Sequence, residues 1–250
     1  MLKLASTWWL ILCSGWSLWA AADTTIKVST IELSIAGFVK DNQAQGAFYD
    51  IANQIVLDAG YIPDNTILPY ARVLQTLMTG SADMSILFTN DAVAKSSDQL
   101  FPISATKNVV IGLIGSNYNH LSDLHGKTVA RVRQASYDDA FNADKLINKY
   151  ATSGYEQSLK MLRAGRVQAI VGSEMSIYST WRQLGYSADT LGEPLILNSK
   201  ESYLQFSKQS KHKAAKDKIM NAAKNLKRRG DIDKIIGDYT GKPYCDDSSC

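Results

Sequence analysis

The sequence predicts an α/β fold of two similar lobes with a cleft between them. The main observation is a pattern that occurs twice: residues 77–86 and residues 162–171 each read as the end of a helix, a glycine and a buried strand. Glycine adopts the left-handed backbone conformation that commonly ends a helix, and the apolar run after it is typical of a strand buried on both faces. Chance recurrence of this common turn in any α/β protein is the alternative explanation.

The first series of elements follows from apolar spacing and from the residues that end each run. Phe48, Ile51 and Ile55 recur at helical spacing, and Gly60 stands where a helix cap belongs. The alternation of strands and helices implies an α/β fold with an at least partly parallel sheet. The expected elements are a strand over 26–30, helices over 46–60 and 70–79, and strands over 82–88 and 108–114.

A second series of strands and helices then begins, and the chain closes with two helices. Ala215, Ile219 and Leu226 form an apolar stripe on the first closing helix. Its lysines lie mostly on another face, which we interpret as a solvated surface because acidic residues follow at once. The expected elements are a strand over 127–132, a mostly helical segment over 137–150, helices over 155–164 and 176–184, strands over 167–171 and 202–206, a helix over 211–229 and a last helix after 231.

The N-terminal segment is predicted to be a secretory signal peptide over residues 1–22. Lys3 precedes a short apolar core, and Ala20, Ala21 and Ala22 offer small residues for cleavage. The apolar run is too short and too interrupted for a membrane anchor, which needs roughly 20 apolar residues. We therefore expect export to the periplasm.

The cysteine content agrees with export. Beyond the signal peptide the chain keeps Cys245 and Cys250, both in a polar tail. In an oxidising compartment we expect these two to form a small disulfide loop, with metal binding as the poorer alternative because no histidine is near. The net charge of +3 over 250 residues is small and argues against a nucleic-acid partner.

Short motifs lie in order along the chain after the N-terminal segment. Residues 46–52 fit G-x-x-x-D-[IL]-[AL], residues 69–83 fit P-[WY]-x-R-x-L…G-x-x-D, residues 121–129 fit dL-x-Gk-x-V, and residues 162–169 are similar to L-x-x-G-r-x-D-A. With closing helices over 226–239, this order resembles the bacterial extracellular solute-binding proteins of family 3, the periplasmic components of polar amino-acid ABC transporters. The resemblance covers almost the whole chain after the signal peptide.

The resemblance implies a periplasmic binding protein-like type II fold: two α/β lobes joined by two crossing strands, with a ligand cleft between them. Lobe one would comprise residues 23–110 and 200–250, and lobe two with the crossover strands would comprise residues 111–199. The lobes would close over a ligand by hinge bending. In open α/β sheets, ligands lie beyond the carboxyl ends of strands, and in this chain those ends are residues 88–90, 133–137 and 172–174.

In lobe one the resemblance implies an aromatic residue that stacks on the ligand, and Tyr70 occupies that place, with a position in the core as the alternative. Polar groups after the strand would face the ligand at Phe88, Thr89 and Asn90. The arginine that pairs with an amino acid's carboxylate in the family corresponds to Lys95, which could instead be a surface lysine. Lysine supplies a point charge without the bidentate fork of arginine.

In lobe two the sequence departs further from the family pattern. Ser136 and Tyr137 stand in the place of the family's serine and threonine, and the aspartate that receives the ammonium group corresponds to Ser173, with Glu174 beside it. Because a buried charge without a partner is costly, an ordinary zwitterionic amino acid is a poorer fit than the family name suggests. Two further possible anion contacts are Arg72, which could instead brace its helix, and Arg133.

The predicted function is a periplasmic solute-binding protein that captures a small polar solute, amino-acid-like or otherwise carboxylate-bearing, for an ABC-type transporter or a sensor. It would act as a monomer without chemistry, cofactor or metal. The alternative is an enzyme on the same scaffold, resembling cyclohexadienyl dehydratase, with Glu32, Asp138 or Glu174 as its acid–base carboxylate. His120 and His125 lie together in a polar loop, which we interpret as solvated although a metal pair is the alternative.

Overall fold

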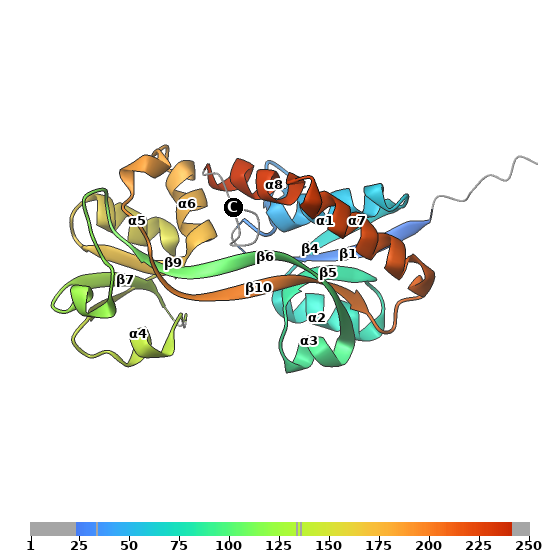
Figure 1. Ribbon diagram of the computed structural model, residues 1–250, viewed down its shortest axis with the longest axis horizontal. Helices are drawn as coiled ribbons and strands as arrows, with labels where there is room; N and C mark the ends of the chain where they lie inside the picture. The colour runs from blue at the N-terminus through green and yellow to red at the C-terminus, as the bar shows by residue number, and fades with distance from the viewer. Residues whose placement is uncertain (1–23, 34, 134, 136, 242–250) are drawn as a thin grey trace, which may run out of the picture.

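The computed structural model describes residues 24–33, 35–133, 135 and 137–241 and consists of two α/β lobes joined by two long strands (Figure 1). Strand β6 (Ser97–Ile111) leaves the first lobe, and β10 (Leu195–Ser207) returns to it from the second lobe. The two strands pair antiparallel along most of their length, from Leu195 opposite Val110 to Ser207 opposite Ser97. They are therefore the covalent connection between the lobes.

The strands of both lobes form one mixed sheet in the order β4-β1-β5-β10-β6-β9-β7-β8. Within each lobe the other strands run parallel to one another, and the crossing strands pair antiparallel with β5 and β9. The remaining strands are β1 (Thr25–Ile31), β4 (Ile62–Leu68), β5 (Met84–Phe88), β7 (Thr128–Val132), β8 (Asn148–Thr152) and β9 (Ala169–Ser173), with a separate hairpin of β2 (Phe38–Lys40) and β3 (Gln43–Gln45).

Helices cover both faces of this sheet. Figure 1 shows α1, α6, α7 and α8 above the sheet and α2, α3 and α4 below it. Each lobe has its own core: Ile51, Ile219 and Phe206 are buried in the first, and Leu159 and Trp181 in the second. The helices are α1 (Ala47–Asp58), α2 (Tyr70–Thr79), α3 (Asp91–Ser96), α4 (Asp139–Ala143), α5 (Tyr155–Arg163), α6 (Glu174–Gln183), α7 (Lys216–Arg228) and α8 (Asp231–Thr240), with short turns at Leu121–Leu124, Ala188–Thr190 and Lys213–Ala215.

The last helix, α8, contacts both lobes. It packs against α1 and α7 of the first lobe and against α6 of the second. The guanidinium of Arg182 on α6 donates a hydrogen bond to the carbonyl oxygen of Asp238 on α8. On the first-lobe side, the Tyr239 hydroxyl donates to Asp50 Oδ2 at 2.5 Å and accepts from the backbone N–H of Gly46 at 3.0 Å.

The pattern that occurs twice in the sequence folds into the same local structure in each lobe. Gly80 and Gly165 both have a left-handed backbone, with φ values of 72° and 69°. Asp83 then exchanges two hydrogen bonds with Lys27 of β1: Asp83 N–H to the Lys27 carbonyl, and Lys27 N–H to Asp83 Oδ2, both at 2.8 Å. Gln168 exchanges the equivalent pair with Thr128 of β7, both at 2.9 Å. The repeat is therefore structural and does not arise by chance.

Most of the predicted elements are confirmed to within a few residues, but the helical prediction for residues 137–150 is wrong. Only Asp139–Ala143 is helical, and the segment continues into strand β8. The side chain of Asp144 accepts the N–H of Leu146 at 2.8 Å and so starts a turn. Tyr150 in β8 is 48% exposed, which suits a strand at the edge of the sheet.

Two predictions fall outside the described residues: the signal peptide at 1–22 and the pairing of Cys245 with Cys250. Within the part of the chain that the structure describes, no helix has the length and apolar character needed to span a membrane. The same residues contain no group of three or more histidine, cysteine, aspartate or glutamate side chains placed to bind a metal. His125 Nε2 instead lies 2.9 Å from Asp144 Oδ2.

Candidate functional site

A cavity of about 990 Å³ lies between the two lobes. Its walls include residues at or just beyond the carboxyl ends of β1, β5 and β9, where ligands bind in open α/β sheets. The crossing strands β6 and β10 supply further wall residues, so that both lobes and their connection surround one space. Its aromatic side chains come from Phe48, Tyr70, Phe88, Tyr137, Tyr155 and Tyr203.

Six of the residues predicted from sequence line this cavity, and four of the other described ones do not. The lining residues are Tyr70, Phe88, Thr89, Asn90, Tyr137 and Ser173. Arg72, Lys95, Arg133 and Glu174 are not among the lining residues, and Ser136 is outside the described part of the chain. Most of the predicted polar and aromatic groups are thus brought together, whereas none of the four predicted charged groups is.

Tyr70 is held in place although its ring is 41% exposed. The Asn90 side-chain amide donates a hydrogen bond to the Tyr70 hydroxyl at 2.8 Å. Asn90 is itself fixed, because its Oδ1 caps helix α3 by accepting the N–H groups of Ala92 at 3.0 Å and Val93 at 3.1 Å. The ring of Tyr70 is therefore oriented before any ligand arrives, which lowers the entropic cost of stacking against it.

A buried hydrogen-bond chain supports Thr89. Gln205 of β10, which is fully buried, donates to Thr89 Oγ1 at 3.0 Å and accepts from Ser97 Oγ at 3.1 Å. Thr89 in turn donates to Gln99 Oε1. Both crossing strands therefore contribute to the position of a cavity residue at the end of β5.

In the second lobe two tyrosines form the cavity wall together. Tyr137 and Tyr155 share a hydrogen bond through their hydroxyl groups. The Tyr155 hydroxyl also accepts the N–H of Ser173 at 3.1 Å, and the Tyr137 hydroxyl accepts the N–H of Val132 at 3.3 Å. Burial raises the pKa of both phenols, and the neighbouring Tyr155 raises that of Tyr137 further. Both hydroxyls are therefore neutral at physiological pH.

Two asparagines on the crossing strands hold the backbone of the second lobe at Tyr137. The side-chain amides of Asn108 on β6 and Asn198 on β10 both donate to the Tyr137 carbonyl, at 3.2 and 2.6 Å. Asn108 also donates to Asn198 Oδ1 at 2.9 Å. This wall is thus tied to the strands that connect the lobes.

The formal charges among the described lining residues are on Lys200 and Glu201 of β10. Glu201 accepts a hydrogen bond from the hydroxyl of Tyr203, and this bond raises the pKa of that phenol. Sequence analysis missed all three residues. Their only local signal is a strand pattern, and their place in the cavity depends on β10 crossing between the lobes.

The predicted charged residues have other surroundings. Arg72 is exposed and donates to Gln75 Oε1 at 3.1 Å, one turn along α2. Lys95 is exposed in the last turn of α3, and Arg133 is exposed just beyond β7. Two of the carboxylates considered for acid–base chemistry also lie off the lining: Glu32 is exposed, and Asp138 caps α4 by accepting the N–H of Phe141 at 2.9 Å.

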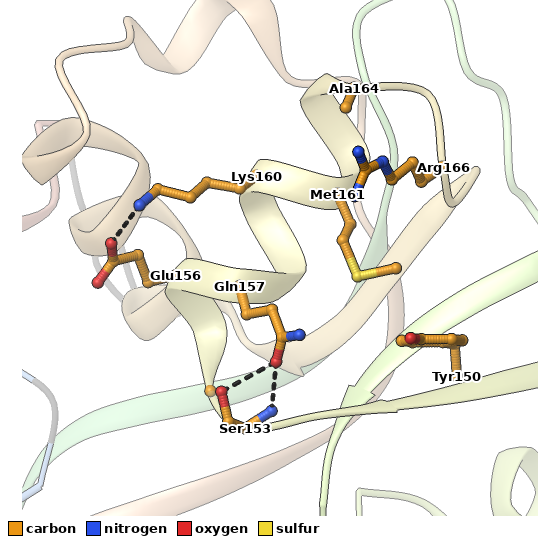
Figure 2. A pocket seen from close by; sticks show the side chains of 9 residues that line it. Tyr150, Ser153, Glu156, Gln157, Lys160, Met161, Ala164 and Arg166 are labelled. Atoms are coloured by element: carbon orange, nitrogen blue, oxygen red, sulfur yellow. Dashed lines mark hydrogen bonds and ion pairs between the residues drawn. The ribbon is translucent and has the colours of Figure 1, made fainter.

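A second hollow of about 1050 Å³ lies on the outer face of the second lobe, between α5 and β8. Figure 2 shows Met161 and Tyr150 on facing sides of this hollow. Its polar groups largely pair with one another: Lys160 Nζ lies 2.6 Å from Glu156 Oε1, and the side chain of Gln157 accepts two hydrogen bonds from Ser153. This hollow involves one lobe alone, so the cavity between the lobes is the better candidate site.

Comparisons with known proteins agree with the two-lobed architecture. No protein-family model matches the chain. A curated relative, the "Probable amino-acid-binding protein YxeM" of Bacillus subtilis (strain 168), is 24% identical over 186 residues, covering 70% of this chain and 68% of that protein. The resemblance expected from the short motifs is therefore confirmed by a relative of the same general kind.

Solved structures match over most of their length at low sequence identity. A polar amino acid ABC uptake transporter substrate binding protein from Streptococcus thermophilus has a TM-score of 0.75 at 18% identity, covering 90% of this chain and 89% of that one. Substrate binding domain 2 of Lactococcus lactis GlnP, in an open conformation, has a TM-score of 0.73 at 19% identity, covering 89% and 97%. The unliganded, open L-cystine solute receptor of Neisseria gonorrhoeae has a TM-score of 0.71 at 18% identity, covering 89% and 95%. The fold is that of the type II periplasmic binding proteins.

Proposed function

We propose that this chain is an exported solute-binding protein of the family 3 type. It captures a small polar solute, amino-acid-like or otherwise carboxylate-bearing, and presents it to an ABC-type transporter or to a membrane sensor. The observation that carries the proposal is the cavity of about 990 Å³ at the junction of the two lobes, lined by oriented aromatic and polar groups from both. The names of the matched proteins, all amino-acid-binding or solute-binding, support the same function.

The proposed mechanism is hinge bending at the crossing strands. Lobe one, residues 23–110 and 200–250, and lobe two, residues 111–199, rotate about β6 and β10 until wall residues from both contact the solute. Residues 1–22 direct export and are removed, and Cys245 and Cys250 form a terminal disulfide loop in the periplasm. Specificity comes from stacking and hydrogen bonds, and no bond in the solute is made or broken.

The experiment is a thermal-shift screen of purified residues 23–250 against amino acids, organic acids and polyamines. A solute at 100 times its dissociation constant adds about 2.7 kcal/mol of stability, which is easily measured. Small-angle X-ray scattering with the same solute should show a smaller radius of gyration, because the lobes close. If no solute stabilises the protein, or if a binding solute leaves its dimensions unchanged, the capture mechanism is wrong.

A pair of tyrosine variants locates the site. Tyr70→Ala should weaken binding about two- to tenfold, because stacking against an aromatic ring is worth about 0.5–1.5 kcal/mol. Tyr150→Ala is the matched control, since Tyr150 is similarly exposed, at 48% against 41%, but lines the outer hollow of the second lobe. Loss of binding in Tyr150→Ala alone would place the solute outside the interlobe cavity. Turnover of a prephenate-like compound would instead favour the dehydratase alternative.

A further inference from the structure

Resting on the proposed function, we infer that the ligand is an aromatic carboxylate without an α-ammonium group, and that its carboxylate binds at Thr106 and Lys200 on the crossing strands. These two residues lie directly opposite each other in the β6–β10 pairing, and both line the interlobe cavity. Paired residues of an antiparallel ladder project to the same face of the sheet. An anion between the lobes therefore meets a hydroxyl and an ammonium group side by side.

Thr106 is the first observation that points to a ligand. Thr106 is only 8% exposed, and its side-chain oxygen is buried without a hydrogen-bond partner. Buried hydroxyl groups are nearly always satisfied in native proteins, so an unsatisfied one calls for an explanation. In the proposed complex this hydroxyl rotates about χ1 toward the cavity that Thr106 lines and donates a charge-assisted hydrogen bond to a carboxylate oxygen of the ligand.

Lys200 is the second observation. It is exposed at the cavity wall and has no ion-pair partner among the described residues. The cation expected from sequence, Lys95, does not line the cavity. Lys200 thus provides positive charge at a different place, on the connection between the lobes and not on a helix of the first lobe.

The acidic side of the cavity explains why a zwitterion is disfavoured. The residue in the place of the family's aspartate is Ser173, which is neutral, and Glu174 is not among the lining residues. Glu201 lines the cavity, but the Tyr203 hydroxyl takes up part of its hydrogen-bonding capacity, and the adjacent Lys200 carries the opposite charge. An α-ammonium group therefore loses its hydration and meets only a carboxylate that Tyr203 already engages, and a poorly compensated charge is costly to bury.

The aromatic part of the inference comes from the rest of the wall. Tyr70 presents a fixed, partly exposed ring, and Tyr137 and Tyr155 present neutral phenols on the opposite lobe. Closure of the lobes brings these groups together around a flat solute. Offset stacking and edge contacts between rings suit an arene better than an aliphatic chain.

Three compounds with the same phenol ring test the inference: 4-hydroxyphenylacetate, L-tyrosine and tyramine. The first carries only a carboxylate, the second carries a carboxylate and an ammonium group, and the third carries only an ammonium group. Isothermal titration on residues 23–250 should show 4-hydroxyphenylacetate binding at least tenfold more tightly than L-tyrosine, and no binding of tyramine. Equal or tighter binding of L-tyrosine or tyramine overturns the inference.

Variants then assign the carboxylate site. Lys200→Gln should weaken 4-hydroxyphenylacetate at least tenfold and leave the melting temperature of the free protein unchanged, because the side chain is exposed. Thr106→Val should weaken binding and raise the melting temperature of the free protein, because it removes an unsatisfied buried hydroxyl. Lys224→Gln, an exposed lysine of α7, is the control. Loss of binding in Lys95→Gln, with Lys200→Gln unaffected, overturns the assignment.

The two levels of proposal fail in different ways. If another solute of the screen closes the lobes while none of the three phenols binds, the aromatic carboxylate is wrong and the binding function stands. If no solute at all stabilises the protein, the proposed function itself fails.

Discussion

Replacing Gly172 with alanine should destabilise the second lobe and disturb the cavity wall at once. An ideal Cβ at Gly172 lies 2.3 Å from Cε1 of Tyr155 and 2.8 Å from its hydroxyl oxygen, whereas ordinary contacts begin at 3.4 Å. The ring must therefore recede by about 1 Å. The strand backbone cannot easily move instead, because β9 is paired with both β6 and β7.

The expected cost has two parts. Overpacking a well-packed site costs about 1–3 kcal/mol. Displacing the Tyr155 hydroxyl also weakens its hydrogen bond from Ser173, worth about 0.5–1.5 kcal/mol net. Together the free energy of unfolding of the second lobe should fall by about 2–4 kcal/mol.

Urea titration followed by tryptophan fluorescence measures this cost directly. Trp181 is the one tryptophan beyond the signal peptide, and it is fully buried in the core of the second lobe. Gly154→Ala is the control, because Gly154 has an extended backbone and nothing lies within 4 Å of its added Cβ. Gly154→Ala should change the free energy of unfolding by at most about 1 kcal/mol, because Gly154 is the N-cap residue of α5.

A double-mutant cycle gives the decisive result. In a Tyr155→Ala background the clash is absent, so Gly172→Ala should cost less than about 0.5 kcal/mol. If Gly172→Ala costs as much in this background as in the native protein, the close approach of Tyr155 is not the reason for glycine at this position.

Three further predictions concern other parts of the fold. Asn90→Asp should keep the cap of α3 and hence stability within about 0.5 kcal/mol, whereas Asn90→Ala should cost about 1 kcal/mol in urea titration. Asn90→Ala should also weaken solute binding, because the hydrogen bond that holds the Tyr70 hydroxyl is then lost, whereas in Asn90→Asp that hydroxyl can donate to the new carboxylate and binding should largely persist. Asp83→Ala should cost about 2–4 kcal/mol, because this buried carboxylate accepts hydrogen bonds from the Lys27 N–H at 2.8 Å and from Ser210 Oγ at 2.6 Å; an effect below 1 kcal/mol by circular dichroism would contradict this. Burial and the hydrogen bond to Asp50 raise the pKa of Tyr239 from 10.0 to about 12. The stability that this phenol adds to the folded protein is therefore complete below pH 10 and is lost as the pH rises toward 12. The urea midpoint of Tyr239→Phe should fall less steeply over this range than that of the native protein, and parallel curves would refute a link between this phenol and stability.

The twice-used pattern was readable in the sequence because its causes are local. Gly80 and Gly165 end helices through their own backbone preference, and Asp83 and Gln168 act at a fixed distance after them. Such features depend on a few neighbouring residues. The two repeated helix–glycine–strand units therefore follow from short-range chemistry, whereas their assembly into lobes depends on long-range strand pairing.

Strand β8 was not predicted, because its sequence carries little local signal. Its five residues, Asn148–Thr152, have one fully buried member and lie at the edge of the sheet, so they carry little apolar alternation. The prediction therefore continued the helical pattern of the preceding residues into this segment. Residues 148–152 form a strand because they pair with β7, and this pairing is not visible in the local sequence pattern.

The cavity was predictable in part for a similar reason. Tyr70, Phe88 and Asn90 follow from motif position and from the rule for strand ends. Lys200 and Tyr203 reach the cavity because β10 crosses from one lobe to the other, a property of the whole topology. Lys95 was chosen by its distance along the sequence, and that distance does not determine which side of the short helix α3 faces the cavity.

Helix α8 ties the rear of the molecule across the division between the lobes. By sequence it follows α7 in the first lobe, yet it rests on α6 and accepts the hydrogen bond of Arg182. If the lobes move by hinge bending as proposed, the contact between α6 and α8 must slide or break during that motion. A chain truncated at Gly230 would lose this contact, and its lobes would be joined by β6 and β10 without the support of α8.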